Sequence, residues 1–176
     1  MTTSTTLKLI ALLAINAWAV ASFAHILLEQ KAAPVASTYK AVFQVGHGCQ
    51  GAATTAVRVQ LPTGFTGAKP MPKAGWVLTT EPGAVNWVAS SPATALPDAH
   101  YDEFVLRGST PAAPGPLRLA VRQSCDTAVQ HWVDVPVSGT STQGLKSPAA
   151  LLQVTGAAGV QPSAPVAAPT APAHQH

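Results

Sequence analysis

Charged and aromatic side chains are scarce in this sequence of 176 residues. Asp, Glu, Lys and Arg make up only 10% of it, and Phe, Trp and Tyr make up 6%. The charges are scattered, and a scattered pattern excludes the basic stripe that follows a nucleic-acid backbone. Nucleophile elbows, HExxH and CxxC motifs and phosphate-binding loops are also missing, so the sequence does not predict a hydrolase. We expect no nucleic-acid partner and no enzymatic activity.

Long apolar runs are missing except near the N-terminus. There Lys8, a short apolar stretch and two small residues form a secretory leader, residues 1–24. This stretch is too short for a membrane span. Cleavage at its end makes His25 the first residue of an exported, periplasmic protein. Cleavage after Ala21 is the alternative, and it would leave Ser22 first.

The remainder of the chain divides into one domain and a tail. Residues 25–155 are enough to bury a single core. Residues 156–176 are rich in Ala and Pro, which predicts a disordered extension. His174 and His176 lie at the end of this tail, where a frayed terminus is the simpler interpretation. Nothing after the leader is expected to span a bilayer.

The domain lacks helical periodicity and alternates as strands do. In residues 54–61, Val57 and Val59 fall on one face, whereas Arg58 and Gln60 fall on the other. The expected strands are 25–29, 39–45, 54–61, 75–80, 84–89, 102–107, 117–123 and 129–135. Short strands separated by turns predict an all-β, two-sheet antiparallel sandwich, immunoglobulin-like or cupredoxin-like. We expect a monomer or, through a free edge strand, a weak dimer.

Cysteine occurs only twice, at Cys49 and Cys125. In an oxidising compartment such a pair normally forms a disulfide. The loop between them is long, and the chain-entropy treatment gives the bridge about 4.5 kcal/mol. The alternative is a soft metal site that contains His47 and Cys49. A cysteine that is already oxidised cannot be its thiolate ligand.

An N-terminal histidine can bind a metal ion in a way that internal histidines cannot. The α-amino nitrogen and ring Nδ1 of His25 can chelate one ion, and such a histidine brace favours Cu(II). His47, in a loop pinned by the disulfide, is a candidate second nitrogen ligand or a solvent-facing histidine. Asp98 and His100 can face one ion if their segment is extended, or can serve as turn residues.

The expected strand 129–135 contains two further candidate residues for the metal site. His131 and Trp132 fall on opposite faces of this strand, so they cannot line one pocket without a bulge. We expect His131 to be half-buried and neutral. Trp132 could shield a copper ion from water.

Several stretches together are similar to a known family. They are His25-Ile26-Leu27-Leu28-Glu29, Tyr39-Lys40-Ala41-Val42-Phe43-Gln44-Val45, His47-Gly48-Cys49, Thr54-Thr55-Ala56-Val57-Arg58-Val59-Gln60-Leu61-Pro62, Lys69-Pro70-Met71-Pro72-Lys73-Ala74-Gly75-Trp76, Leu96-Pro97-Asp98-Ala99-His100-Tyr101-Asp102-Glu103-Phe104 and His131-Trp132. This combination resembles the YcnI-type copper-binding family in its Gram-negative form.

The resemblance implies an exported β-sandwich that holds Cu(II) on its N-terminal histidine. It also implies a glutamate ligand and a tryptophan beside the metal, which Trp132 matches. Tyr39 stands where the glutamate is expected, so the chain departs from the family pattern. Glu29 is the nearest carboxylate in sequence, but four strand positions place it about 13 Å from His25.

The leading functional hypothesis is a periplasmic Cu(II)-binding protein. It would sequester one copper ion or pass it to a copper-transport or copper-chaperone protein. The expected ligands and their neighbours are His25, Glu29, His47 and His100, with Trp132, Tyr39 and Asp98 nearby. One alternative is a copper oxidase with a histidine brace, whose second histidine would be His47, His100 or His131. The other is a metal-free adhesion or partner-binding module.

Overall fold

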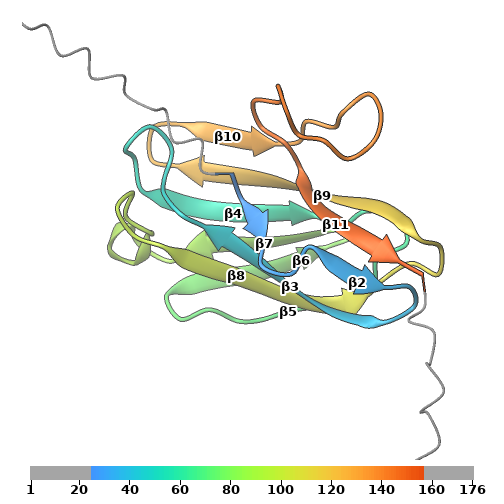
Figure 1. The fold of residues 1–176 in the computed structure, drawn as a ribbon. Coiled ribbons are helices and arrows are strands. Elements are labelled where there is room, and N and C mark those ends of the chain that lie inside the picture. The colour runs from blue at the N-terminus through green and yellow to red at the C-terminus, as the bar shows by residue number, and fades with distance from the viewer. Residues whose placement is uncertain (1–24, 157–176) are drawn as a thin grey trace, which may run out of the picture.

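The computed structural model describes residues 25–156, which form two β-sheets packed face to face (Figure 1). The leader and nearly all of the tail expected from the sequence lie outside the described residues. The strands are β1 (Leu27–Leu28), β2 (Ala32–Pro34), β3 (Thr38–Val45), β4 (Thr54–Gln60), β5 (Thr66–Pro70), β6 (Trp76–Glu81), β7 (Ala84–Ala89), β8 (Asp102–Ser109), β9 (Gly115–Cys125), β10 (Val129–Trp132) and β11 (Ala150–Thr155). A single 3-10 turn, η1 (Pro92–Thr94), separates β7 from β8.

The smaller sheet has the strand order β1-β3-β8-β5. The larger sheet has the order β2-β11-β9-β4-β7-β6, with β10 also paired to β9. Every pairing is antiparallel except that of β2 with β11, which is parallel. The all-β, two-sheet sandwich expected from the sequence is therefore confirmed, with one parallel pair that was not foreseen.

The core lies between the sheets and follows the alternation of the strands. Val57 and Val59 of β4 are fully buried, as their spacing predicts, whereas Gln60 is exposed. The largest buried side chains include Trp87 of β7 and Phe43 of β3. Each inward row removes apolar surface from water, which is the main favourable contribution to folding.

Strand β9 organises the end of the sandwich where the candidate site lies. One of its edges pairs with β4, and the opposite edge is shared by β11 and β10. Ala150 of β11 is opposite Leu119, and Trp132 of β10 is opposite Val121. Strands β10 and β11 both run beside β9 in Figure 1. Segments from the last third of the chain thus reach the segment that begins at His25.

Three strands were not expected from the sequence, namely β2, β5 and β11. The expected strand 129–135 ends at Trp132, and 25–29 contracts to Leu27–Leu28. Within residues 25–156, the structure contains no helix that is long and apolar enough to cross a membrane.

Candidate functional site

His25 and Trp132 meet at one end of the sandwich, each from a different sheet. The centroids of their rings are 5.8 Å apart, and the rings meet edge to face at 80°. His25 is half-buried just before β1, and Trp132 is 5% exposed at the end of β10. A tryptophan face or edge held beside an imidazole can exclude water from one side of it. The family resemblance places both residues beside one metal ion, and the structure brings the two side chains together.

A buried glutamine holds the indole in position. Gln123 on β9 is 1% exposed, and its side-chain oxygen accepts a hydrogen bond of 3.2 Å from Nε1 of Trp132. Its Nε2 donates to the carbonyl of His47 and to Oγ1 of Thr54, each at 2.8 Å. Buried polar groups that are satisfied in this way fix one arrangement of the core. Gln123 therefore connects Trp132 to the His47 loop.

Sequence reasoning missed Gln123, although a signal was present. Within β9, Leu119, Val121, Gln123 and Cys125 alternate onto the buried face. A lone amide in an otherwise apolar inward row requires partners, because an unsatisfied buried amide costs free energy. That requirement marks such a residue as part of a specific network.

The disulfide expected from the sequence is confirmed. Cys49 and Cys125 are bonded, with their Cα atoms 5.9 Å apart. Cys49 lies in the loop between β3 and β4, and Cys125 is the last residue of β9. The bridge therefore fastens the loop that carries His47 to the strand that carries Gln123.

The loop after His47 is a tight turn that requires glycine. Cys49 and Ala52 exchange two backbone hydrogen bonds of 3.1 and 3.0 Å. A Cβ atom at position 48 would lie 1.8 Å from the carbonyl oxygen of Ala52, so Gly48 is the residue that fits. The Nδ1 of His47 hydrogen-bonds the carbonyl of Gly48, which fixes the orientation of the ring.

Two hollows flank this network. The first, of about 220 Å³, is lined by His25, Lys31, Thr140, Thr142, Pro148 and Leu151, among others. The second, of about 380 Å³, is lined by His47, Gln50, Val129, Gln130, Trp132 and Lys146, among others. His25 and His47 thus line different hollows and are connected through Trp132 and Gln123.

Asp98 and His100 lie in a turn, which agrees with the second of the two alternatives that the sequence left open. The backbone N–H of His100 donates to the carbonyl of Pro97 at 3.0 Å, and His100 is exposed. Asp98 instead accepts a hydrogen bond of 3.0 Å from the backbone N–H of Gly48. Its carboxylate thereby positions the His47 loop, the turn role that was the alternative in the sequence.

His131 is exposed, so the half-buried histidine expected from the sequence is wrong. It lies opposite Arg122 of β9, on the outer face of the larger sheet. Alternation placed it correctly on the face opposite Trp132. No described element packs on that outer face at His131, so the ring remains in solvent.

Tyr39 is buried in the core, and its hydroxyl donates to the carbonyl of Gln30 at 2.5 Å. Leu27 lies opposite Gln44 in the register of β1 with β3, and five positions along β3 from Gln44 to Tyr39 span about 17 Å. The backbone of Tyr39 is therefore far from the start of β1, and its hydroxyl bonds Gln30, which follows that strand. Glu29 is exposed, and its backbone N–H donates to the carbonyl of Val42 at 3.1 Å.

Burial, followed by the negative charge of Glu29, raises the pKa of Tyr39 from 10.0 to about 12. The unfolded chain then loses this proton first, so we expect the free energy of unfolding to fall as pH rises from about 10 to about 12. Tyr101→Phe leaves Tyr39 as the single tyrosine. Absorbance titration of tyrosinate in this variant should give a midpoint near 12 when folded and near 10 in urea. A folded midpoint near 10 would contradict the burial argument.

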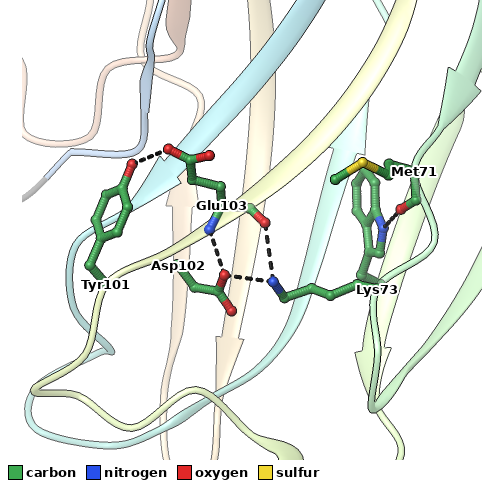
Figure 2. A network of polar contacts seen from close by, with 6 residues as sticks. Met71, Lys73, Tyr101, Asp102 and Glu103 are labelled. Atoms are coloured by element: carbon green, nitrogen blue, oxygen red, sulfur yellow. Dashed lines mark hydrogen bonds and ion pairs between the residues drawn. The ribbon is translucent and has the colours of Figure 1, made fainter.

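The acidic residues at the start of β8 are engaged with neighbours (Figure 2). Asp102 accepts from Nζ of Lys73 at 2.6 Å and from the backbone N–H of Glu103 at 2.8 Å. Glu103 accepts from the hydroxyl of Tyr101 at 2.5 Å. Both carboxylates at the start of β8 therefore have hydrogen-bond partners.

A metal ion in the first hollow would be bound mainly by the nitrogen atoms of His25. Residues 25–156 contain no group of three or more His, Cys, Asp and Glu side chains that could hold a metal. The first hollow is lined by His25, Thr140 and Thr142, whose nitrogen and oxygen atoms are possible metal donors, and by Lys31, whose ammonium cannot bind a metal. This donor set fits Cu(II) only when the α-amino nitrogen of His25 joins the ring, which requires His25 to be the first residue.

The fold and this site define an immunoglobulin-like β-sandwich that carries a histidine–tryptophan pair at one end. A profile described as a domain of unknown function, DUF1775, matches residues 25–86 and 78–154. The chain belongs to the DUF1775 family.

Among solved structures, an uncharacterized protein from Nocardia farcinica with an immunoglobulin-like fold has a TM-score of 0.63 at 22% identity. The match covers 74% of this chain and 97% of that one. The seventh ScaB type I cohesin from Pseudobacteroides cellulosolvens has a TM-score of 0.45 at 10% identity, covering 86% of this chain and 96% of that one. A comparison with curated proteins finds no match. The likeness to the Nocardia farcinica protein concerns the fold alone.

Proposed function

We propose that this protein binds one Cu(II) ion through an N-terminal His25 and sequesters it or delivers it to a copper-transport or copper-chaperone protein in the periplasm. The observation that carries the proposal is the contact between His25 and Trp132, 5.8 Å between ring centroids. Cleavage of the leader before His25 would add its amino nitrogen to the ring nitrogen. The family resemblance in sequence agrees with this pair of residues.

The surroundings of the pair support a specific site. Trp132 is held by Gln123, and the disulfide from Cys49 pins the loop to which Gln123 bonds. A residue whose rotamer is locked by buried partners can keep a ligand in one geometry. The edge of the indole limits access of water to one side of the imidazole ring.

The same placements favour binding over oxidation. A copper oxidase of the histidine-brace type needs a second imidazole in the copper plane. His47 lines another hollow. His100 is exposed in a turn, and His131 is exposed on the outer face of β10. We therefore propose a carrier or a sequestering protein without catalytic activity.

Copper titration followed by electron paramagnetic resonance tests the proposal. The exported protein, with His25 confirmed as its first residue by intact mass, should give one stoichiometric, nitrogen-coordinated signal. Replacing a residue that supports a metal ligand typically costs 10- to 100-fold in affinity, so His25→Ala, which removes a ligating ring, should cost at least about 100-fold. One added glycine before His25 should have the same effect, since it displaces the α-amino nitrogen.

Two control variants test whether His131 or the tail histidines contribute to copper binding. His131→Ala removes an exposed imidazole from the same end of the fold and should leave affinity unchanged. The double variant His174→Ala/His176→Ala removes the tail histidines and should also leave the signal unchanged. Retention of full affinity in His25→Ala would refute the proposal.

A metal-free partner-binding function is the second candidate, and one surface favours it. On the outer face of the larger sheet, one cross-strand row runs through Val129, Ser124, Ala56, Val88 and Val77, and it is apolar except at Ser124. Val77 is 53% exposed, Val88 37% and Val129 44%. An apolar row on a sheet face can serve for protein contact. Absent or heterogeneous copper binding in the titration would favour this function over the first.

A further inference from the structure

Three cations stand side by side across the outer face of the smaller sheet. Lys40 of β3 lies opposite Arg107 of β8, and Arg107 lies opposite Lys69 of β5. All are exposed, and none forms an ion pair or a side-chain hydrogen bond in the described part of the chain. Like charges directly opposite one another destabilise a sheet. A row of this kind is unfavourable unless something else neutralises it.

Hydroxyl groups form the neighbouring row on the same face. Thr38 and Thr66 both lie opposite Ser109. A hollow of about 200 Å³ is lined by Thr38, Gly67, Lys69, Arg107, Gly108 and Ser109. Two of the three cations, Lys69 and Arg107, therefore line one hollow together with Thr38 and Ser109, and Lys40 lies beside Arg107 at its side.

An irregularity in β5 contributes to this hollow. Between Thr66 and Lys69 the pairing with β8 shifts by one residue, as in a β-bulge. The extra residue of a bulge stays outside the ladder, and Gly67 has a φ of +62° there. Backbone N–H groups in such left-handed turns are typical of anion-binding concavities.

The opposite end of β8 behaves differently. There Lys73 pairs with Asp102, and Tyr101 donates to Glu103, as Figure 2 shows. Asp102 and Glu103 are the only carboxylates on β3, β5 and β8. Glu103 is four residues from Arg107 along the strand, about 13 Å. The chain neutralises its charges at one end of β8 and leaves three cations unneutralised at the other.

We infer that the row of Lys40, Arg107 and Lys69 binds a phosphate group, the free anion or the phosphate of a lipid headgroup. The guanidinium of Arg107, at the centre of the row, matches two phosphate oxygens, and the two flanking ammonium groups supply point charges. The hydroxyls of Thr38 and Ser109 can donate to the remaining oxygens. This site is separate from His25 and does not depend on copper binding.

The test is a nuclear magnetic resonance titration of the ¹⁵N-labelled exported protein with sodium phosphate, at ionic strength held constant with sodium chloride and without copper. We expect saturable shifts confined to the amides of 38–40, 66–69 and 107–109. Arg107→Gln should weaken binding at least about 10-fold, because charge-assisted hydrogen bonds are lost. Arg122→Gln, an exposed arginine on the other sheet, should leave binding unchanged. Unsaturable shifts together with no binding to phosphatidylglycerol vesicles, or the same shifts in Arg107→Gln, would overturn the inference.

Vesicle flotation distinguishes the two sources of phosphate. Binding to phosphatidylglycerol vesicles that is lost in Arg107→Gln assigns the site to a lipid headgroup. Saturable phosphate binding without flotation assigns it to a soluble phosphoryl compound. If neither occurs, the site does not exist.

Thermal unfolding provides a check that the variant folds. Without phosphate, Arg107→Gln should melt at the same temperature as the parent or higher, because it relieves repulsion between like charges. Added phosphate should raise the melting temperature of the parent more than that of Arg107→Gln, since only the parent binds it. Equal increases in both proteins would contradict a specific site.

Discussion

Replacing Cys49 and Cys125 together by alanine is expected to lower the free energy of unfolding by about 4.5 kcal/mol. The two residues are separated by 76 positions, so the bridge removes much of the freedom of the unfolded chain. Both cysteines are buried, at 6% and 7% exposure, and alanine leaves little space unfilled. Urea unfolding at equilibrium measures the difference.

Reduction supplies a matched control for the disulfide prediction. Thiol reductant should destabilise the parent protein by a similar amount and leave the double variant unchanged. A loss below about 1 kcal/mol would mean that the unfolded chain is already compact in this region.

Replacing Trp132 by alanine is expected to lower the free energy of unfolding by about 3 to 5 kcal/mol. The side chain is almost completely buried in the core, and its removal opens a cavity beside His25. It also leaves the Oε1 of Gln123 without its hydrogen bond from the indole, which adds a desolvation cost. Urea unfolding reports the loss, and copper titration of the same variant reports its effect on the site.

Two further variants separate the causes of that loss. Trp132→Phe keeps an aromatic ring and removes the N–H, so it should lose less, about 1 to 3 kcal/mol. Trp76→Ala removes an indole that is only half-buried at the edge strand β6 and should cost less than Trp132→Ala. If Trp76→Ala costs as much, burial of Trp132 is not what stabilises this end of the fold.

Alternation of apolar residues was sufficient to predict most of the sandwich. The strand expected at 54–61 is β4, which ends at Gln60, and 84–89 is β7. The cysteine pair was predictable because only one pairing exists. These features depend on local pattern or composition, which the sequence displays directly.

The missed strands lacked such local signals. β2 has three residues and ends in proline, and β5 contains Gly67 and Pro70. β11 alternates, with Leu152 and Val154 buried, but it adjoins an Ala/Pro-rich tail that obscures the pattern. Its place in the sheet is decided by pairing with β9, a contact between distant segments.

The proximity of His25 and Trp132 was predictable from the sequence, but the positions of the other candidate residues were not. N-terminal chemistry and the resemblance together pointed to His25 and Trp132, which the structure brings together. His47 and His100 were expected near the same ion, but they lie on the second hollow and in an exposed turn. Strand register and loop hydrogen bonds decide such distances, and neither can be read from one sequence.

The parallel pairing of β2 with β11 has a consequence for the order in which the protein matures. Ala33, near the start of the domain, is aligned with Val154 at its end. A chain is synthesised from its N-terminus, so His25 is made long before the segment around Ala149 and Leu151 that completes its hollow. The hollow beside His25 is therefore complete only when the last strand, β11, has joined the sheet.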